Sequence, residues 1–204
     1  MKTLTKEIQN SLRPKDALAI LKEGNERFVS NYKFGRNLKE QVIQTSTGQF
    51  PFAVILSCID SRVPAELVYD LGIGDVFSVR VAGNIVNEDV LGSIEYGCKV
   101  AGSKIVVVLG HTKCGAVTAA CNNVELGNIT PLLAKIKPAV DSFRTGNEIV
   151  EGELIEKVAL ENVRLSKENI LANSPILKEM NDNGEIDIVG ASYDVETGRI
   201  SYFE

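Results

Sequence analysis

Short, continuous apolar segments constrain the fold of this chain more than any other feature of its sequence. They are rich in β-branched residues and do not alternate with polar ones, as a strand with one solvated face would. The segments are PFAVILS at 51–57, VFSVRV at 76–81, KIVVVLG at 104–110 and EIDIVGAS at 185–192. We expect them to be parallel strands of a sheet that is covered by helices on both faces.

Helical patterns precede and separate these segments. In residues 14–31, Leu18, Leu21 and Phe28 recur at helical spacing beside charged residues, which predicts an amphipathic helix. Further helices are expected at 38–44, at 64–69, at 87–100 and between 114 and 181. A turn signal at 194–198 predicts that the last strand folds back as an antiparallel edge. The fold class is therefore α/β, with four parallel strands plus one antiparallel edge strand.

The size and composition of the chain favour one domain. Its 204 residues are 44% hydrophobic, and no repeat or linker interrupts them. We expect a single domain over 1–204, made of a helical arm at 1–48 and an α/β core at 49–204. A net charge of -5 with no basic stripe argues against nucleic acid as a partner. No apolar stretch predicts a signal peptide or membrane span, so a cytoplasmic protein without membrane contact is expected.

Two cysteines and the single histidine follow predicted strands. Cys58 comes directly after FAVILS, His111 comes directly after KIVVVLG, and Cys114 lies three residues further on. Ligands of an open parallel sheet bind at the carboxyl ends of its strands. Two thiolates and one imidazole are donors that suit zinc, and three protein ligands leave a fourth position open for catalysis.

Asp60 and Arg62 decide what occupies that fourth position. Asp60 is close enough in sequence to Cys58 to be a fourth zinc ligand in a closed state. Arg62 is placed to form a bidentate pair with Asp60 and to draw it off the metal, so that water can bind. The other cysteines, Cys98 and Cys121, lie in helical patterns and are interpreted as small buried hydrophobic residues.

The motifs CIDSRVPAEL at 58–67 and GHTKCG at 110–115 are each weak signals alone but are highly specific as a pair. Together they resemble the signature of β-class carbonic anhydrases. LKEGNERF, GDVFSVRVAGN, SIEYG, SPIL and IVGASYD are also similar to that family's pattern, so the resemblance covers nearly the whole chain. It implies reversible hydration of carbon dioxide to bicarbonate and a proton by zinc-bound hydroxide. Cys58, His111 and Cys114 would be the zinc ligands, and Asp60 and Arg62 the catalytic pair.

The resemblance also implies a substrate pocket and an assembly. Gln49, Phe77, Tyr96 and Gly115 match substrate-binding positions, and the family forms homodimers or homotetramers. The order VRVAGN departs from the more usual Arg-Asn-hydrophobic-Ala-Asn, which puts Ala82 and Gly83 in the expected pocket wall.

Two other functions are compatible with the same residues. A zinc hydroxide could also hydrolyse carbonyl sulfide or carbon disulfide, and the ligand residues do not discriminate these substrates from carbon dioxide. Asp60 could instead close the metal site permanently and make a non-catalytic zinc-binding module, although an intact Arg62 argues against this.

Overall fold

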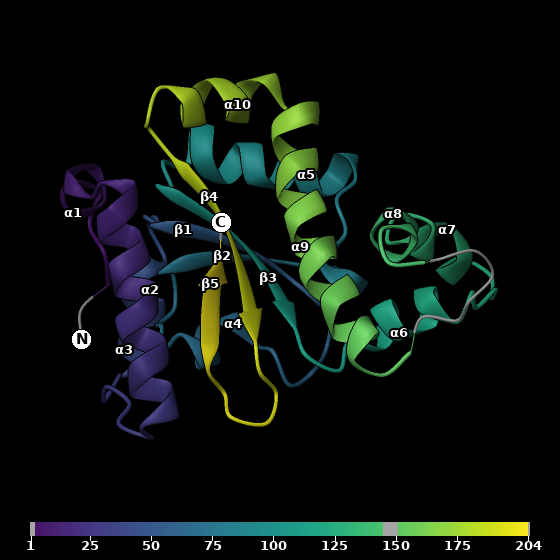
Figure 1. The fold of residues 1–204 in the computed structure, drawn as a ribbon. Coiled ribbons are helices and arrows are strands. Elements are labelled where there is room, and N and C mark those ends of the chain that lie inside the picture. Colours follow the sequence, from purple (N-terminus) through teal and green to yellow (C-terminus); the bar gives the residue numbers. More distant parts are fainter. Residues whose placement is uncertain (1–2, 145–150, 204) are drawn as a thin grey trace.

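A central five-stranded sheet organises the computed structural model, which describes residues 3–144 and 151–203 (Figure 1). The strand order is β2-β1-β3-β4-β5. The strands are β1 (Ala53–Ser57), β2 (Val76–Arg80), β3 (Ile105–His111), β4 (Asp187–Tyr193) and β5 (Ile200–Phe203). β2, β1, β3 and β4 run parallel, and β5 pairs antiparallel with β4. The predicted fold class is confirmed.

Helices precede the sheet, connect its strands and cover its faces. They are α1 (Lys6–Ser11), α2 (Pro14–Val29), α3 (Leu38–Thr45), α4 (Ala65–Val68), α5 (Glu88–Glu95), α6 (Gly115–Cys121), α7 (Ile129–Leu133), α8 (Lys137–Asp141), α9 (Glu153–Asn173) and α10 (Pro175–Asp182). A 3-10 turn, η1 (Ala82–Asn84), follows β2, and a π-helical turn, η2 (Tyr96–Val100), extends α5. Among the described helices, none combines the length and apolarity needed to span a bilayer.

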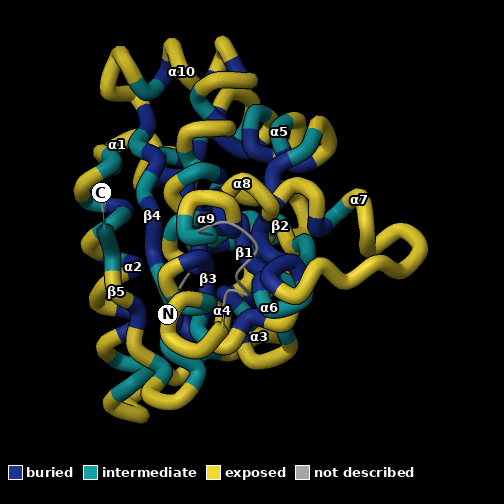
Figure 2. The backbone as a smooth tube through the Cα atoms, turned by 45° about the vertical axis from the view of Figure 1, so that its right-hand side comes forward, coloured by how far each residue is buried: buried dark blue, intermediate teal, exposed yellow. Residues whose placement is uncertain are grey.

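The two faces of the sheet bury separate apolar cores, because side chains alternate along each strand. Ile55 and Val107 pack with Leu21 of α2 and Val68 of α4 on one face. On the other face, residues such as Val54 and Val106 pack with α5, α9 and α10. Burial is complete along β1 and β3, where the tube in Figure 2 is dark blue.

The expectation of two covered faces is wrong for β2. This strand lies at the edge of the sheet, and its residues are half-buried or exposed. Phe77, Val79 and Val81 give this segment the sequence of a central strand, but they contribute to the core only in part. The edge of β2 is therefore open in the single chain.

Helix α9 lies close against the sheet because glycines make room for it. A Cβ atom on Gly110 would lie 2.5 Å from Val163 Cγ2, and one on Gly190 would lie 3.2 Å from Val163 Cγ1. These two glycines stand on the adjacent strands β3 and β4, so Val163 sits in a notch between them. The notch fixes the height and register of α9 over the sheet.

The N-terminal arm is held to the core by buried polar contacts. Gln9 of α1 donates hydrogen bonds of 2.7 Å to the Pro51 carbonyl and 2.9 Å to the Ala101 carbonyl. Asp70, whose side chain is 3% exposed, accepts hydrogen bonds from Arg27 Nε at 2.6 Å and Arg36 Nη1 at 2.5 Å. Burial acts to raise the pKa of Asp70, but the bonds from Arg27 and Arg36 outweigh it and hold the pKa below its usual value.

Candidate metal centre

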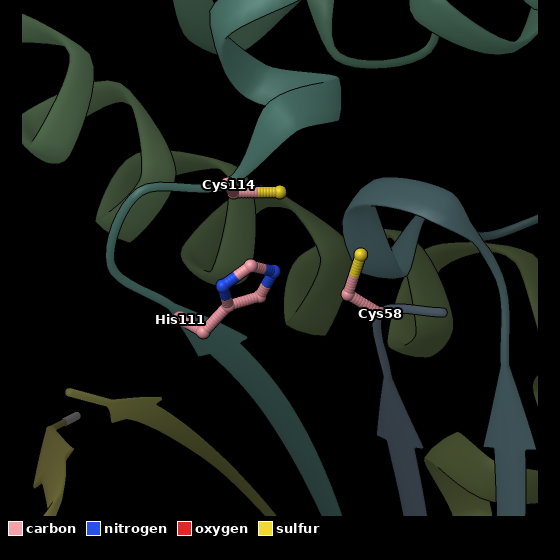
Figure 3. Close-up of side chains that lie close together, drawn as sticks. All are labelled: Cys58, His111 and Cys114. Atoms are coloured by element: carbon pink, nitrogen blue, oxygen red, sulfur yellow. The ribbon is translucent and has the colours of Figure 1, made fainter. Parts of the chain in front are cut away.

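Cys58, His111 and Cys114 meet at the carboxyl ends of β1 and β3 (Figure 3). Cys58 follows β1, His111 is the last residue of β3 rather than the first beyond it, and Cys114 is the N-cap of α6. Their donor atoms lie within 4.8 Å of one another, and the residues are only 4%, 1% and 2% exposed. The three predicted ligands are therefore brought together at one buried point.

The orientation of His111 leaves one ring nitrogen for a metal. Its Nδ1 lies 2.9 Å from the Thr112 carbonyl oxygen, so Nδ1 carries the proton and donates it there. Its Nε2 is buried and has no hydrogen-bond partner among the described residues. A buried nitrogen without a partner is costly unless something binds it, and a metal between the two sulfurs would do so.

The two sulfurs interact strongly with each other. The side-chain hydrogen bond with Cys114 is the main reason that the pKa of Cys58 falls to about 4, and the same contact raises the pKa of Cys114. Burial acts to lower the pKa of His111, but the nearby negative charge of the Cys58 sulfur raises it. Two sulfurs, one of which ionises readily, and an imidazole nitrogen are a donor set that fits zinc, whose charge would favour loss of the second thiol proton.

The Gly83 backbone N–H donates a 3.3 Å hydrogen bond to Cys58 Sγ. Gly83 adopts a φ of +67°, and a Cβ there would lie 2.6 Å from Ile136 Cδ1, so glycine is required on both counts. The VRVAGN segment therefore places a backbone donor beside the Cys58 sulfur.

Asp60 and Arg62 form a two-point ion pair beside these three residues. Arg62 Nε donates to Asp60 Oδ1 at 2.9 Å, and Arg62 Nη2 donates to Oδ2 at 2.8 Å. Asp60 Oδ2 lies 3.9 Å from His111 Nε2, which places the carboxylate at the edge of the metal position. The hydrogen bond from Arg62 holds the pKa of Asp60 well below its usual range.

Arg80, at the end of β2, also reaches this site and was not predicted to do so. Its Nε donates to the Cys58 carbonyl at 3.1 Å, and its Nη2 donates to the Asp60 carbonyl at 2.7 Å. Arg80 therefore fixes the backbone that carries the first ligand and the carboxylate. The parallel pairing of β1 with β2 creates this contact, and spacing within one segment gives no sign of it.

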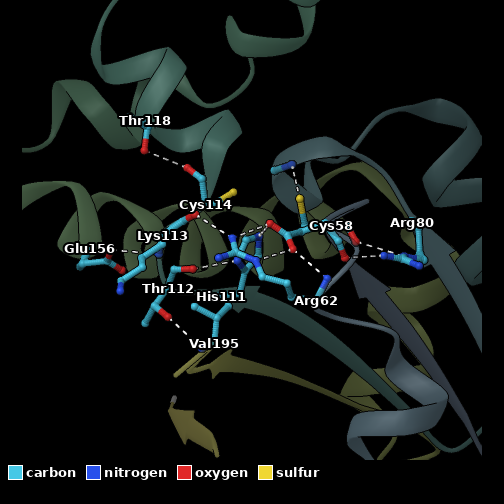
Figure 4. Close-up of polar contacts among 12 residues, drawn as sticks. Cys58, Arg62, Arg80, His111, Thr112, Lys113, Cys114, Thr118, Glu156 and Val195 are labelled. Atoms are coloured by element: carbon cyan, nitrogen blue, oxygen red, sulfur yellow. Dashed lines mark hydrogen bonds and ion pairs between the residues drawn. The ribbon is translucent and has the colours of Figure 1, made fainter. Parts of the chain in front are cut away.

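The loop between His111 and Cys114 is held from two sides (Figure 4). Lys113 has a left-handed φ of +55°, which is uncommon for a residue with a side chain. Its backbone N–H donates a 3.0 Å bond to Glu156 Oε1 of α9, and its carbonyl accepts a 3.3 Å bond from Arg62 Nη2. Glu156 was likewise not singled out from the sequence.

The predicted substrate residues are not all near the metal ligands within one chain. Gly115 follows Cys114 directly and begins α6. Gln49 is exposed before the start of β1, whereas Cys58 follows its end, so the strand separates them by roughly 17 Å. Phe77 is paired with Val54 near the start of the sheet, also away from the ligands.

Phe77 and Tyr96 do lie together, with ring centroids 6.1 Å apart in an edge-to-face arrangement. They line an open groove of about 750 Å³ between β2 and α5. Arg80 lines the same groove, which links it to the backbone of Cys58.

Cys98 and Cys121 are buried in apolar clusters, as predicted. Burial raises the pKa of the Cys98 thiol to about 12, so it stays protonated.

Comparisons with known proteins agree with this site. A family model described as "Carbonic anhydrase" matches residues 53–200. Carbonic anhydrase 2 of Mycobacterium tuberculosis is 36% identical over 197 residues, with 91% of each chain covered. The structure of the β-carbonic anhydrase CafA of Aspergillus fumigatus superposes with a TM-score of 0.71 and 27% identity, over 93% of this chain and 90% of that one. One of two tetrameric β-carbonic anhydrases from Sordaria macrospora shares the fold, with a TM-score of 0.70 and 24% identity over 81% of this chain and 90% of that one.

Proposed function

The chain belongs to the β-class carbonic anhydrase family, and on that premise we propose a role for each residue of the site. It is a carbonic anhydrase (carbonate dehydratase), which interconverts carbon dioxide and bicarbonate, and its Cys-His-Cys triad is of the zinc type found in this family. The observation that carries the assignment is the convergence of three buried donor atoms within 4.8 Å at the strand ends.

Cys58, His111 and Cys114 would hold the zinc ion. Bound there, zinc supplies Lewis-acid activation of water near neutral pH. Two thiolates donate more charge to the metal than imidazoles do, so we expect carbon dioxide hydration to be faster at alkaline pH.

Asp60 would orient the reacting water by accepting its hydrogen bond. Its low pKa supports this role, because an ionised carboxylate is an acceptor only. Arg62 would keep Asp60 ionised and in place through the bonds at 2.9 Å and 2.8 Å. When Arg62 releases it, Asp60 would become a fourth zinc ligand and close the site.

Gln49, Phe77, Tyr96 and Gly115 would line the substrate site. Because Gln49 stands at the opposite end of β1 from Cys58, it would act in the site of a second copy of the chain. The open edge of β2 and the groove at Phe77 and Tyr96 support a homodimer or a homotetramer.

The expected compartment and the expected domain organisation also have support. Cys58 and Cys114 bind metal only when reduced, which favours the cytoplasm as the compartment of this enzyme. The continuous sheet and its two cores support one domain over 1–204, with an arm at 1–48 and a core at 49–204.

Metal analysis combined with stopped-flow hydration of carbon dioxide tests the assignment. The purified chain should carry about one zinc ion, and Cys58→Ala, His111→Ala and Cys114→Ala should each lose zinc and activity together. Cys98→Ala is the matched control, because Cys98 is equally buried but distant from the ligands in the sequence, and it should keep both. Full activity in a metal-free preparation would contradict the proposal. Carbonyl sulfide and carbon disulfide assayed on the same preparation separate the alternative substrates.

A further inference from the structure

Helix α9 contacts the backbone that touches the first ligand sulfur. Asn162 Nδ2 donates a 2.8 Å hydrogen bond to the Gly83 carbonyl, and the Gly83 N–H donates to Cys58 Sγ at 3.3 Å. We propose that Asn162 is a positioning residue, which fixes Gly83 so that its N–H stays directed at the Cys58 sulfur. The inference rests on the zinc site of the proposed function.

Gly83 needs an external anchor because its own backbone has little preference. Its left-handed conformation, with φ +67° and ψ 18°, is one of several that glycine adopts at similar free energy. A rotation at Gly83 would turn its N–H away from the sulfur. The bond from Asn162 to the carbonyl of the same residue opposes that rotation.

Asn162 is itself rigidly held. It is 3% exposed, and the next residue along α9, Val163, sits in the notch formed by Gly110 and Gly190. The side-chain amide is therefore presented to Gly83 from a helix whose position over the sheet is fixed. Outer-shell groups placed in this way on rigid elements control how ligands bind a metal.

The hydrogen bond to sulfur has a chemical consequence. An N–H donor withdraws electron density from a thiolate, so Cys58 would donate less charge to zinc. This partly offsets the effect of two thiolate ligands on the acidity of zinc-bound water. Asn162 would thus tune the metal without touching it or the substrate.

Ser166 provides a matched control on the same helix. Its hydroxyl donates a 3.3 Å bond to the Asn84 carbonyl, one residue beyond Gly83, and it is buried like Asn162. Ser166→Ala therefore removes a buried bond between α9 and the same turn but leaves Gly83 anchored.

The experiment compares wild type, Asn162→Leu and Ser166→Ala by two readouts other than hydration activity. One is the near-ultraviolet sulfur-to-metal charge-transfer band of the cobalt(II)-substituted protein. The other is the rate at which zinc is lost to a chelator. Asn162→Leu should shift the band and speed zinc loss by about 10–100-fold, whereas Ser166→Ala should leave both near wild type even where it lowers the unfolding temperature.

Each outcome decides the question. An unchanged band and unchanged zinc loss in Asn162→Leu, or equal changes in Ser166→Ala, would overturn the positioning role. If Asn162→Leu does not fold, Asn162→Ala gives the same two readouts with less steric demand. A wild type that binds neither zinc nor cobalt would instead overturn the proposed function, so the two failures are distinguishable.

Discussion

Asp60 Oδ2 lies 2.8 Å from Arg62 Nη2 and 3.9 Å from His111 Nε2, so one carboxylate oxygen stands between its cation and the metal position. Because the pKa of Asp60 is held well below its usual range, this oxygen is charged throughout the neutral and mildly acidic range. A metal ion bound by Cys58, His111 and Cys114 would therefore compete with the arginine for the same anion.

Arg62→Ala should close the metal site. Without its bidentate partner, Asp60 is free to bind zinc and to exclude water, so we expect full zinc content with hydration slowed by about 100-fold or more. Crystal structures of wild type and Arg62→Ala at neutral pH show where Asp60 lies. Arg164→Ala removes an equally exposed arginine that pairs with Glu161, and it should leave hydration unchanged. If Arg62→Ala is active and Asp60 stays off the metal, the proposed closure of the site by Asp60 is wrong.

Asp60→Ala should leave the metal site open at every pH, and carbon dioxide hydration should still be slow. Zinc stays open to water, but the water loses its orienting acceptor. Lowering the pH should close the wild type, because the depletion of hydroxide favours the still-ionised Asp60 as a ligand, whereas Asp60→Ala has no carboxylate with which to close. Metal-edge X-ray absorption of both chains between pH 6 and pH 9 follows the fourth ligand. The same coordination in both chains at low pH would argue against acid closure.

Gln49→Ala should lower kcat/KM about tenfold and leave zinc content unchanged, because it removes one substrate hydrogen bond and no ligand. Since Gln49 lies far from Cys58 in its own chain, mixing two variants that are each defective at one of these residues should restore hydration activity. A dimer of one Gln49→Ala chain and one Cys58→Ala chain contains one site with both an intact zinc triad and an intact glutamine. Stopped-flow hydration after mixed refolding should therefore exceed the sum of the two separate proteins. No gain on mixing would place the role of Gln49 within a single chain or remove it.

Glu156→Ala should loosen the loop that joins two ligands. It removes the acceptor for the Lys113 N–H, which holds a left-handed backbone, and we expect zinc loss to a chelator to be about tenfold faster. Glu156→Gln keeps an acceptor oxygen and should restore the slow rate. Glu196→Ala, which removes only the exposed partner of the Lys113 ammonium group, serves as the control and should change little. Equal zinc loss in Glu156→Ala and wild type would make this contact incidental.

Asp70→Asn should lower the free energy of unfolding by about 3–5 kcal/mol near neutral pH, because it leaves two buried arginine contacts without their anion. The folded pKa of Asp70 lies below its unfolded value near 4, so its stabilisation is complete above that value. The stabilisation is then lost as the pH falls through the folded pKa. Denaturant unfolding of both chains should therefore show a difference that narrows as the pH falls below about 4. Asp16→Asn, at the exposed pair with Arg13, should show no comparable difference at any pH.

The sequence was sufficient to predict the sheet and the meeting of Cys58, His111 and Cys114 at one point. β1 and β3 are mostly apolar and fully buried, and their ends are marked by Cys58 and by His111 with Cys114, so local pattern and strand direction together place the donors at one edge. The final antiparallel strand followed from the turn at 194–198, where Gly198 has a left-handed φ of +74°.

Contacts between distant segments could not be predicted in this way. α1 was missed, because six residues with a buried Gln9 and no apolar face carry no periodic signal. The helix expected at 87–100 ends as an α-helix at Glu95 and continues as a π-helical turn. The side chains of Arg80, Glu156 and Asn162 form hydrogen bonds with backbone groups near the site. Backbone groups are the same in nearly every residue, so the sequence gives no sign of these contacts.

The strand order β2-β1-β3-β4-β5 also determines when the site can mature during synthesis. β3, which carries His111, needs β4 along its other edge, yet α9 and β4 are made after β3. At roughly 5–20 residues per second, several seconds separate the synthesis of Cys114 from that of Tyr193. During that interval the nascent chain presents all three donors without the helix and strand that orient them. We therefore expect selective capture of zinc only after α9 and β4 have left the ribosome.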